Sequence, residues 1–321
     1  MKKINFPDNK KFIFTIIDDT DDAFLENIKP VYDFLYEYGI FITKTVWVYP
    51  PRDEESKGHS LQHDGYRDFI IELKKKGYEI ALHNIGSGEY LQEEILTGLE
   101  EYKKILGEYP RIHINHSYNP DSIYGGCKRF DFPFNHIIRL LHPVYARNFQ
   151  GEVPDSPCFW GDVHKKIIQY NRNYETDDLN TLKFNPLMPY YDQSRGEYSN
   201  LWFSSTFAPN PWMFNRIVQP EAVDRLEEEG GVCVLYTHLG YYMKNGKIDQ
   251  GFVDKIKYLS TKRNAWFAPV STVLDFLRQQ RKQDPEISAV KKFKYDLLYL
   301  FVRFKYRKII KIDDYFFKQQ H

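Results

Sequence analysis

The sequence predicts an α/β protein built on a parallel sheet or a barrel. Short apolar runs of strand length alternate with longer stretches that carry apolar residues at helical spacing. The connections between them are short, and this alternation is typical of right-handed βαβ units. The length of 321 residues fits one barrel-sized domain better than two independent domains.

The first half of the chain shows the alternation clearly. Within residues 11–17, the residues after Lys11 form a continuous run of apolar and β-branched residues, which is typical of a strand covered on both faces. Residues 22–38 then carry apolar side chains at helical spacing, and the pattern stops at Gly39. The same signals predict further strands over 40–49, 78–82 and 111–115, and further helices over 66–76 and 90–106.

The second half is less regular. Residues 119–162 are rich in Pro, Gly and aromatic residues, so we expect long loops with one short helix over 133–141. Apolar and β-branched runs then predict four more strands, over 166–174, 181–185, 201–207 and 232–237. Three more helices are predicted over 220–229, 250–261 and 271–281.

Composition narrows the function. The chain has 44 basic and 44 acidic side chains, so no net field favours a nucleic acid, and none is expected as a partner. The three cysteines have no paired spacing, which indicates a reducing compartment. The first residues lack the apolar core of a secretory signal, and no stretch reaches the ~20 apolar residues of a membrane span. We therefore expect a cytoplasmic protein.

Chemically distinctive residues follow several predicted strands. Asp18 and Asp19 follow the first strand, and His83, His116 and His238 each follow a later one. Carboxyl ends of parallel strands meet on one side of the sheet, where such folds bind ligands. Two adjacent carboxylates at the end of a buried strand favour a bound cation. Alternatively, the acidic residues only cap the helix that follows.

Three segments resemble sequence blocks of the polysaccharide deacetylase family, the NodB-homology carbohydrate esterases. Residues 15–20 (Thr-Ile-Ile-Asp-Asp-Thr) look like the family's Thr-Phe-Asp-Asp-Gly block. Residues 79–84 (Glu-Ile-Ala-Leu-His-Asn) are similar to its Glu-Ile-Gly-Asn-His-Ser/Thr block, and residues 234–238 (Val-Leu-Tyr-Thr-His) to its late Leu-x-His block. The resemblance covers residues 10–281 and implies a distorted (β/α) barrel of about seven parallel strands, which we place over residues 1–283.

The resemblance also implies an activity. It points to a metal-dependent hydrolase that removes an N-acetyl or related acyl group from a sugar or saccharide precursor, using one divalent metal ion, typically zinc. By position, Asp18 matches the catalytic base and His238 the catalytic acid. Asp19 matches the carboxylate ligand of the metal, and His83 matches its first histidine ligand.

One family residue is missing. The second block of the family continues to another metal-binding histidine, but Ser87 stands at that position here. Serine is a poor zinc ligand. His116, after the neighbouring strand, is the candidate that would complete the site; in the alternative interpretation it only hydrogen-bonds a loop.

Exposed aromatic residues could stack on a sugar ring. Four residues are the candidates, although burial in the core is the alternative for each: Trp160, Tyr190, Tyr191 and Trp202. Two other functions stay open. One is a non-catalytic saccharide-binding or assembly protein on a degenerate barrel; the other is a metal-dependent hydrolase of an amide that is not an acetamido sugar.

The C-terminal extension, residues 284–321, differs in character. Residues 289–312 hold eight basic residues and one acidic residue, interleaved with apolar ones. This pattern predicts a basic amphipathic helix on an anionic membrane, which would place the protein peripherally at the inner membrane surface. Alternatively, the helix packs its apolar side on the barrel or on a second subunit.

Overall fold

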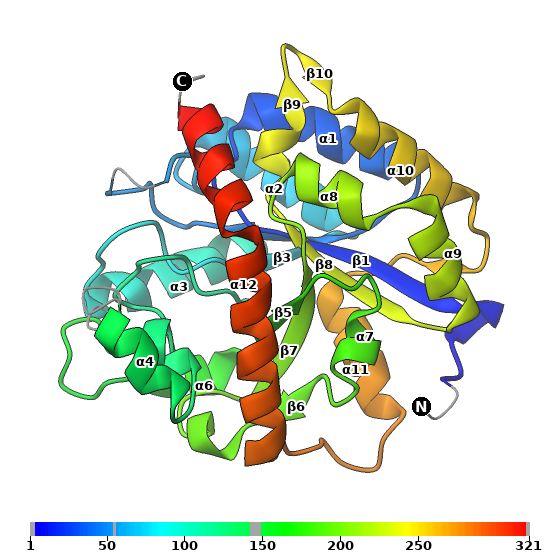
Figure 1. The fold of residues 1–321 in the computed structure, drawn as a ribbon. Coiled ribbons are helices and arrows are strands. Elements are labelled where there is room, and N and C mark those ends of the chain that lie inside the picture. Colours follow the sequence, from blue (N-terminus) through cyan, green and yellow to red (C-terminus); the bar gives the residue numbers. More distant parts are fainter. Residues whose placement is uncertain (1–3, 54–55, 142–148, 319–321) are drawn as a thin grey trace.

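The computed structural model describes residues 4–53, 56–141 and 149–318, and seven parallel strands in it close into a barrel (Figure 1). Each strand pairs with the next, and the last pairs with the first. In order around the barrel they are β1 (Phe12–Asp18), β2 (Thr43–Val46), β3 (Glu79–Leu82), β4 (Ile112–His113), β5 (Tyr170–Thr176), β7 (Leu201–Phe207) and β8 (Val232–Thr237). The predicted barrel of parallel strands is confirmed.

Four short strands complete the sheets. β11 (Ala265–Trp266) runs parallel to the start of β1, and β6 (Tyr190–Tyr191) runs antiparallel to the start of β7. β9 (Met243–Lys244) and β10 (Lys247–Ile248) form a separate hairpin. Both barrel-associated strands therefore lie at the end where β1 and β7 begin, opposite the end where the parallel strands finish.

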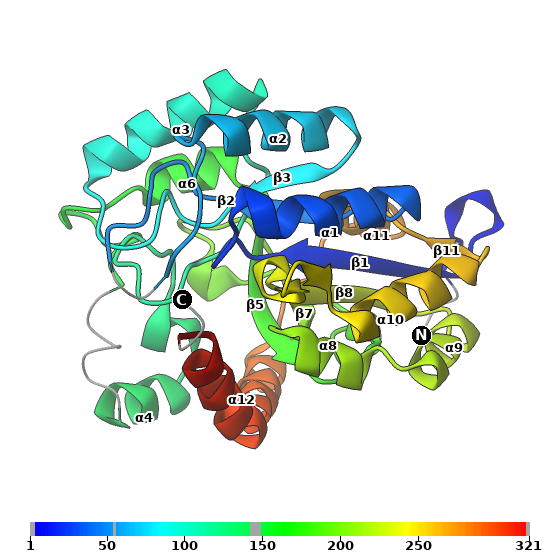
Figure 2. The same cartoon turned by 90° about the horizontal axis from the view of Figure 1, so that it is seen from above.

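Helices cover the outside of the barrel (Figure 2). β1 is buried along its whole length because one face points into the barrel and the other lies under this helical layer. In chain order the helices are α1 (Leu25–Glu37), α2 (Asp64–Lys75), α3 (Gln92–Leu106), α4 (Phe134–Leu141), α6 (Gly161–Ile167), α7 (Thr181–Phe184), α8 (Pro211–Ile217), α9 (Pro220–Glu228), α10 (Gln250–Thr261), α11 (Val270–Gln279) and α12 (Ala289–Lys318).

One predicted strand is a helix. A strand was expected over residues 181–185, but this segment forms α7 (Thr181–Phe184), a single helical turn. The side chain of Asn180 accepts a hydrogen bond from the Lys183 backbone N–H and caps this turn. A run of only a few apolar residues does not distinguish a strand from a buried helical turn, which explains the error.

The C-terminal extension is the long helix α12, and it packs along β5 (Figure 1). Four of its side chains are buried against the barrel: Tyr295, Tyr299, Val302 and Tyr306. Buried Lys292 pairs with Asp131 and with Asp192. The alternative prediction, a helix docked on the barrel, is confirmed. Within the described residues, none of the helices has the length and hydropathy needed to cross a bilayer.

Candidate metal centre

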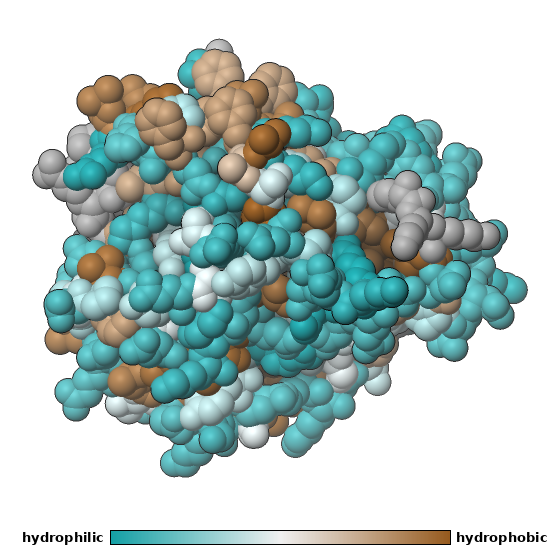
Figure 3. Space-filling view, turned by 90° about the horizontal axis from the view of Figure 1, so that it is seen from below, coloured by the Kyte–Doolittle hydropathy of each residue, from teal (hydrophilic) through white to brown (hydrophobic). Residues whose placement is uncertain are grey.

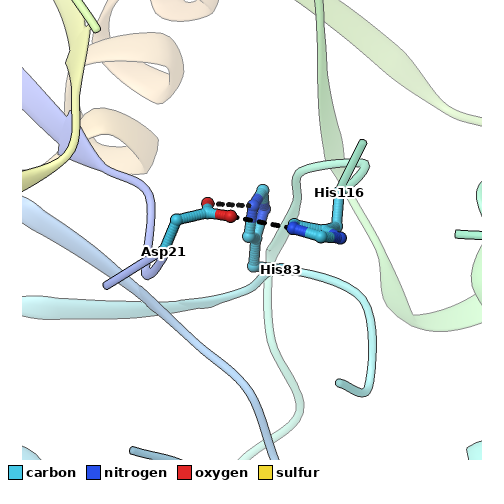
Figure 4. Close-up of side chains that lie close together, drawn as sticks. All are labelled: Asp21, His83 and His116. Atoms are coloured by element: carbon cyan, nitrogen blue, oxygen red, sulfur yellow. Dashed lines mark hydrogen bonds and ion pairs between the residues drawn. The ribbon is translucent and has the colours of Figure 1, made fainter. Parts of the chain in front are cut away.

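Three side chains converge above the end of the barrel where the parallel strands finish, here called the barrel mouth (Figure 4). Asp21 follows β1, His83 follows β3 and His116 follows β4, and one ligand atom from each lies within 4.8 Å of the others. Asp21 Oδ1 is 2.8 Å from His116 Nε2, and Asp21 Oδ2 is 3.2 Å from His83 Nε2. These three residues are called the Asp–His–His group below.

The backbone after β1 positions Asp21. The Asp19 backbone N–H still bonds to Thr237 of β8, so the strand geometry persists to that residue. The chain then turns: the Ala23 N–H bonds to the Thr20 carbonyl, and Asp22 has a positive φ of 53°. This turn carries the Asp21 carboxylate over the mouth, toward the two imidazoles.

Both histidines are oriented through their outer nitrogen. His83 Nδ1 lies 3.1 Å from the Ile114 carbonyl oxygen, which only accepts, so Nδ1 is the donor. His116 Nδ1 likewise donates to Asn119 Oδ1 at 2.8 Å. Both rings therefore turn Nε2 toward Asp21. Metal-binding histidines are usually held in this way, with the second nitrogen donating to a carbonyl or carboxylate oxygen.

The charges of Asp21, His83 and His116 shift one another's pKa values. Burial lowers the pKa of His83, against the opposing charges of Asp19 and Asp21. For His116 the effect of burial is outweighed by the charge of Asp21, and the pKa is raised. Burial disfavours the charged form of Asp21, but the neighbouring His116 outweighs this effect and holds the pKa of Asp21 well below its usual range. The group thus combines one carboxylate with two imidazoles, a donor set that suits a divalent ion such as Zn²⁺.

His238 lies beside this group, as its position after β8 predicts. Its Nε2 is 3.4 Å from Asp21 Oδ2, and its Nδ1 donates to the Pro209 carbonyl at 2.7 Å. Burial opposes its charge, but the hydrogen bond and charge of Asp21, together with the charge of Asp19, raise the pKa of His238 to about 9. His238 is therefore protonated near neutral pH in this arrangement.

Asp19 lies next to the group without belonging to it. Its two oxygens pair with the Arg172 guanidinium at 3.1 and 2.6 Å, and this guanidinium stacks on the Tyr236 ring at 4.0 Å. Its charge nevertheless acts on both His83 and His238, so the carboxylate is near both imidazoles. The structure thus places Asp21, two residues beyond the predicted Asp19, in the Asp–His–His group.

Asp18 points away from the mouth. Successive residues of a strand alternate between the two faces, so Asp18 is directed toward the helical layer while Asp19 faces the barrel. There its carboxylate accepts from Tyr32 Oη at 2.8 Å and from the Leu239 N–H at 2.7 Å, and it pairs with Lys44 at 3.1 Å. Both Asp18 and Lys44 are fully buried. The structure does not bring the predicted base to the candidate centre.

His116 lies in the group, as one of the two alternatives predicted, while Ser87 does not. The Ser87 hydroxyl donates to the Asp53 carboxylate instead. Ser56, from the same loop as Asp53, places its hydroxyl oxygen 2.8 Å from Asp21 Oδ1 and 3.0 Å from His116 Nε2. No feature of the sequence singled out Ser56, because nothing in the sequence of a charged loop shows where it folds back.

The four predicted sugar-stacking aromatics do not line the mouth. Trp160 and Trp202 are 1% and 3% exposed, and their indole N–H groups donate to the Asp121 carbonyl and to Ser199 Oγ. Tyr190 and Tyr191 form β6, at the opposite end of the barrel, and Tyr190 is fully buried. Trp160 is the N-cap residue of α6, and the other three residues lie in the strands β6 and β7, so none of the four is presented on an exposed loop.

Comparisons with known proteins identify the fold. No protein-family model and no curated protein matches the sequence. Among solved structures, the chain is similar to one of Pseudomonas aeruginosa PAO1 described as a probable polysaccharide deacetylase, at 12% identity over 87% of this chain and 94% of that one, with a TM-score of 0.50. It is equally similar to Puue Allantoinase, with the same identity, coverage and TM-score. Peptidoglycan deacetylase PdaC of Bacillus subtilis matches at 14% identity over 85% of this chain and 94% of that one, with a TM-score of 0.40.

The two similarities with a TM-score of 0.50 and the closed barrel of parallel strands show that the chain has the NodB-like (β/α) barrel fold of polysaccharide deacetylases. At this level of identity they do not carry an activity from one protein to another. The side chains at the mouth that can take part in chemistry are the Asp–His–His group, the Asp19–Arg172 pair and His238.

Proposed function

We propose that this protein is a metal-dependent hydrolase that removes an N-acetyl or related acyl group from a sugar or saccharide precursor. The observation that carries the proposal is the Asp–His–His group at the mouth of a barrel with the deacetylase fold. A divalent ion bound there, zinc in our proposal, would acidify a water molecule and polarise the acyl carbonyl.

Asp21, His83 and His116 would hold the ion. Their Nε2 and carboxylate atoms already face one another, and the hydrogen bonds to Ile114 and Asn119 fix both rings. The imidazoles are almost completely buried, whereas Asp21 keeps 14% of its side-chain surface exposed. The group therefore has a dry inner side formed by the imidazoles and one partly exposed ligand, Asp21.

Asp19 is the proton acceptor in this proposal, in place of Asp18. Arg172 fixes its carboxylate through two hydrogen bonds, and a carboxylate has about four lone-pair positions, so acceptor capacity remains. Asp19 would take a proton from the attacking water. Asp18 has no such access, because its carboxylate is enclosed by Tyr32, Lys44 and the Leu239 backbone.

His238 is the proton donor. An amine leaves badly as an anion, so cleavage of the amide bond needs a proton at the departing nitrogen. His238 carries a proton near neutral pH, and its bond to the Pro209 carbonyl keeps Nε2 directed toward the group. It would give the Nε2 proton to the leaving amine, while the acyl group departs as the free acid.

A second candidate follows from the fold comparison. The barrel is as similar to an allantoinase as to a polysaccharide deacetylase, so hydrolysis of an amide outside the saccharides is a specific alternative. The same residues would serve both reactions, since each needs an activated water and a protonated leaving nitrogen. The substrate that the protein hydrolyses therefore distinguishes the two candidate functions.

The test is hydrolysis by the zinc-loaded protein. We expect acetate release from at least one member of a panel of acetamido sugars, sugar nucleotides and lipid-linked saccharides, and none from Asp19→Asn at unchanged zinc content. Product formation from allantoin alone would select the second candidate. Saccharide binding without any hydrolysis by the loaded protein would contradict both and indicate a non-catalytic binding protein.

A further inference from the structure

Most of the exposed large hydrophobic side chains of the described residues gather on two neighbouring helices. Four lie on α4 or just before it and five lie along α12, whereas four are scattered elsewhere. The nine are Phe132, Ile137, Leu140, Leu141, Val290, Phe293, Leu297, Phe301 and Phe304, and together they are called the α4–α12 surface. Figure 3 shows the brown side chains gathered along one edge of the molecule.

The two helices form one continuous surface. The rings of Phe134 in α4 and Phe293 in α12 lie 5.1 Å apart, and Asp131, just before α4, pairs with Lys292 of α12. Both contacts hold the exposed side chains of α4 beside those of α12. A contiguous apolar surface of this kind marks an interaction site, unlike single exposed hydrophobic residues.

The spacing on α12 gives the helix two apolar faces. The exposed residues recur every three or four positions and therefore share one stripe of the helix. A different stripe, with Tyr295, Tyr299 and Tyr306, is buried on the barrel. Docking on the barrel thus covers only one apolar face of α12, and the outer apolar face stays exposed.

The charges on this surface identify the partner. Lys291, Lys294 and Arg307 of α12 and Arg139 of α4 are all exposed. Among the described side chains of the two helices the single acidic residue, Asp296, is buried. An apolar stripe flanked by cations matches an anionic bilayer surface. A symmetric contact with a second copy would set these cations against one another.

We propose that the α4–α12 surface docks peripherally on anionic lipid bilayers, with its apolar side chains at the acyl boundary and its cations among the headgroups. The helix α12, which carries part of this surface, also reaches the ends of β5 and β7 at the barrel mouth, because Arg303 pairs with Glu175 and Tyr306 packs on Phe207. A membrane-borne saccharide would then reach the mouth from the bilayer; this consequence rests on the proposed function, whereas docking does not.

The test is flotation of the full-length protein with vesicles of phosphatidylcholine alone or enriched in phosphatidylglycerol. We expect binding to the anionic vesicles only, weakening as salt rises. Leu297→Gln/Phe301→Gln should weaken binding about tenfold or more, and Lys291→Gln/Lys294→Gln several-fold with a shallower salt dependence. The matched control is Trp212→Gln, which alters an exposed aromatic on α8 and should leave binding unchanged.

All four altered side chains are exposed, so the variants should keep the melting temperature and zinc content of the parent. Three results would overturn the proposal. They are failure to float with anionic vesicles, flotation that the double variants leave unchanged, and a concentration-dependent dimer that the variants abolish while vesicle binding is absent.

Discussion

Three carboxylates close together in the sequence occupy three different environments. Asp18 faces the helical layer and pairs with Lys44, Asp19 faces the barrel and pairs with Arg172, and Asp21 reaches over the mouth to two imidazoles. Strand alternation separates the first two, and the turn after Thr20 redirects the third. Three residues of the same type thus differ in position: Asp18 belongs to a buried ion pair, Asp19 lies beside the candidate metal centre, and Asp21 lies within it.

The sequence indicated that the site lies where the parallel strands end, but it did not show which acidic residue takes which position there. The histidines after three strands could be found because each ends an apolar run, and His83, His116 and His238 do meet at the mouth. The choice among the acids depends on where β1 ends and how the next residues turn, which side-chain type does not reveal. Arg172 was missed as well, although an arginine inside a predicted strand signals the need for a buried partner.

At the residue scale we predict that Asp18→Asn destabilises the fold. It leaves the Lys44 ammonium buried without a counter-ion, which should cost about 3 kcal/mol in the free energy of unfolding measured with urea. The double variant Asp18→Asn/Lys44→Met should recover most of the loss. Asp33→Asn, which removes an exposed pair with Lys29, is the control and should change stability by less than about 1 kcal/mol. A wild-type stability for Asp18→Asn would refute the structural role.

We also predict that Asn119 tunes the metal affinity through His116. Its Oδ1 accepts from His116 Nδ1, and its Nδ2 donates to the Gly86 carbonyl at 2.7 Å. Asn119→Ala should weaken zinc binding about 10- to 100-fold in a chelator competition. Asn200→Ala removes a half-buried amide that likewise bonds to backbone carbonyls, those of Lys165 and Ile168, and it should leave the zinc affinity unchanged. Equal affinities in both variants would contradict a positioning role.

At the element scale, periodicity predicted long segments well and short ones poorly. The helices at 66–76 and 90–106 match α2 and α3 closely, because each buries one stripe along several turns. Residues 181–185 carry too few positions to show a period, and the Asn180 cap decided the outcome. For α12 the sequence showed the amphipathic pattern, but the presence of two apolar faces emerged only from which tyrosines the barrel buries.

Asp296 links the docking of α12 to pH. Burial raises its pKa from the ordinary 3.8 to about 6. Between these values the folded chain keeps a proton that the unfolded chain has lost, so stability decreases as pH rises through this window and is constant above it. A shift of about two pKa units changes the free energy of unfolding by at most about 3 kcal/mol.

We therefore predict that Asp296→Asn removes this component of the pH dependence. The free energy of unfolding of the parent, measured at about pH 4 and about pH 7, should fall more over this interval than that of the variant, by up to about 3 kcal/mol. The difference between the two proteins cancels the titration of the carboxyl groups that do not interact with Asp296. Parallel pH profiles for parent and variant would show that Asp296 has no raised pKa.

At the scale of the whole molecule, closure of the barrel creates the site. β8 pairs with β1 along its length, so His238 meets Asp21 from a strand more than two hundred residues away in the sequence. The alternation of strands and helices predicted the parallel barrel, and the family resemblance predicted its closure. The aromatic side chains could not be assigned in advance, because a packed core and a sugar site favour the same residues.

The most direct test of the account is the zinc content of two neighbouring variants purified without chelator. If Asp21 belongs to the centre and Asp19 only flanks it, the parent and Asp19→Asn should each hold about one zinc ion per chain by elemental analysis. Asp21→Asn should hold almost none. Retention of zinc by Asp21→Asn together with its loss from Asp19→Asn would contradict the account, as would a parent that binds no divalent ion when titrated with zinc.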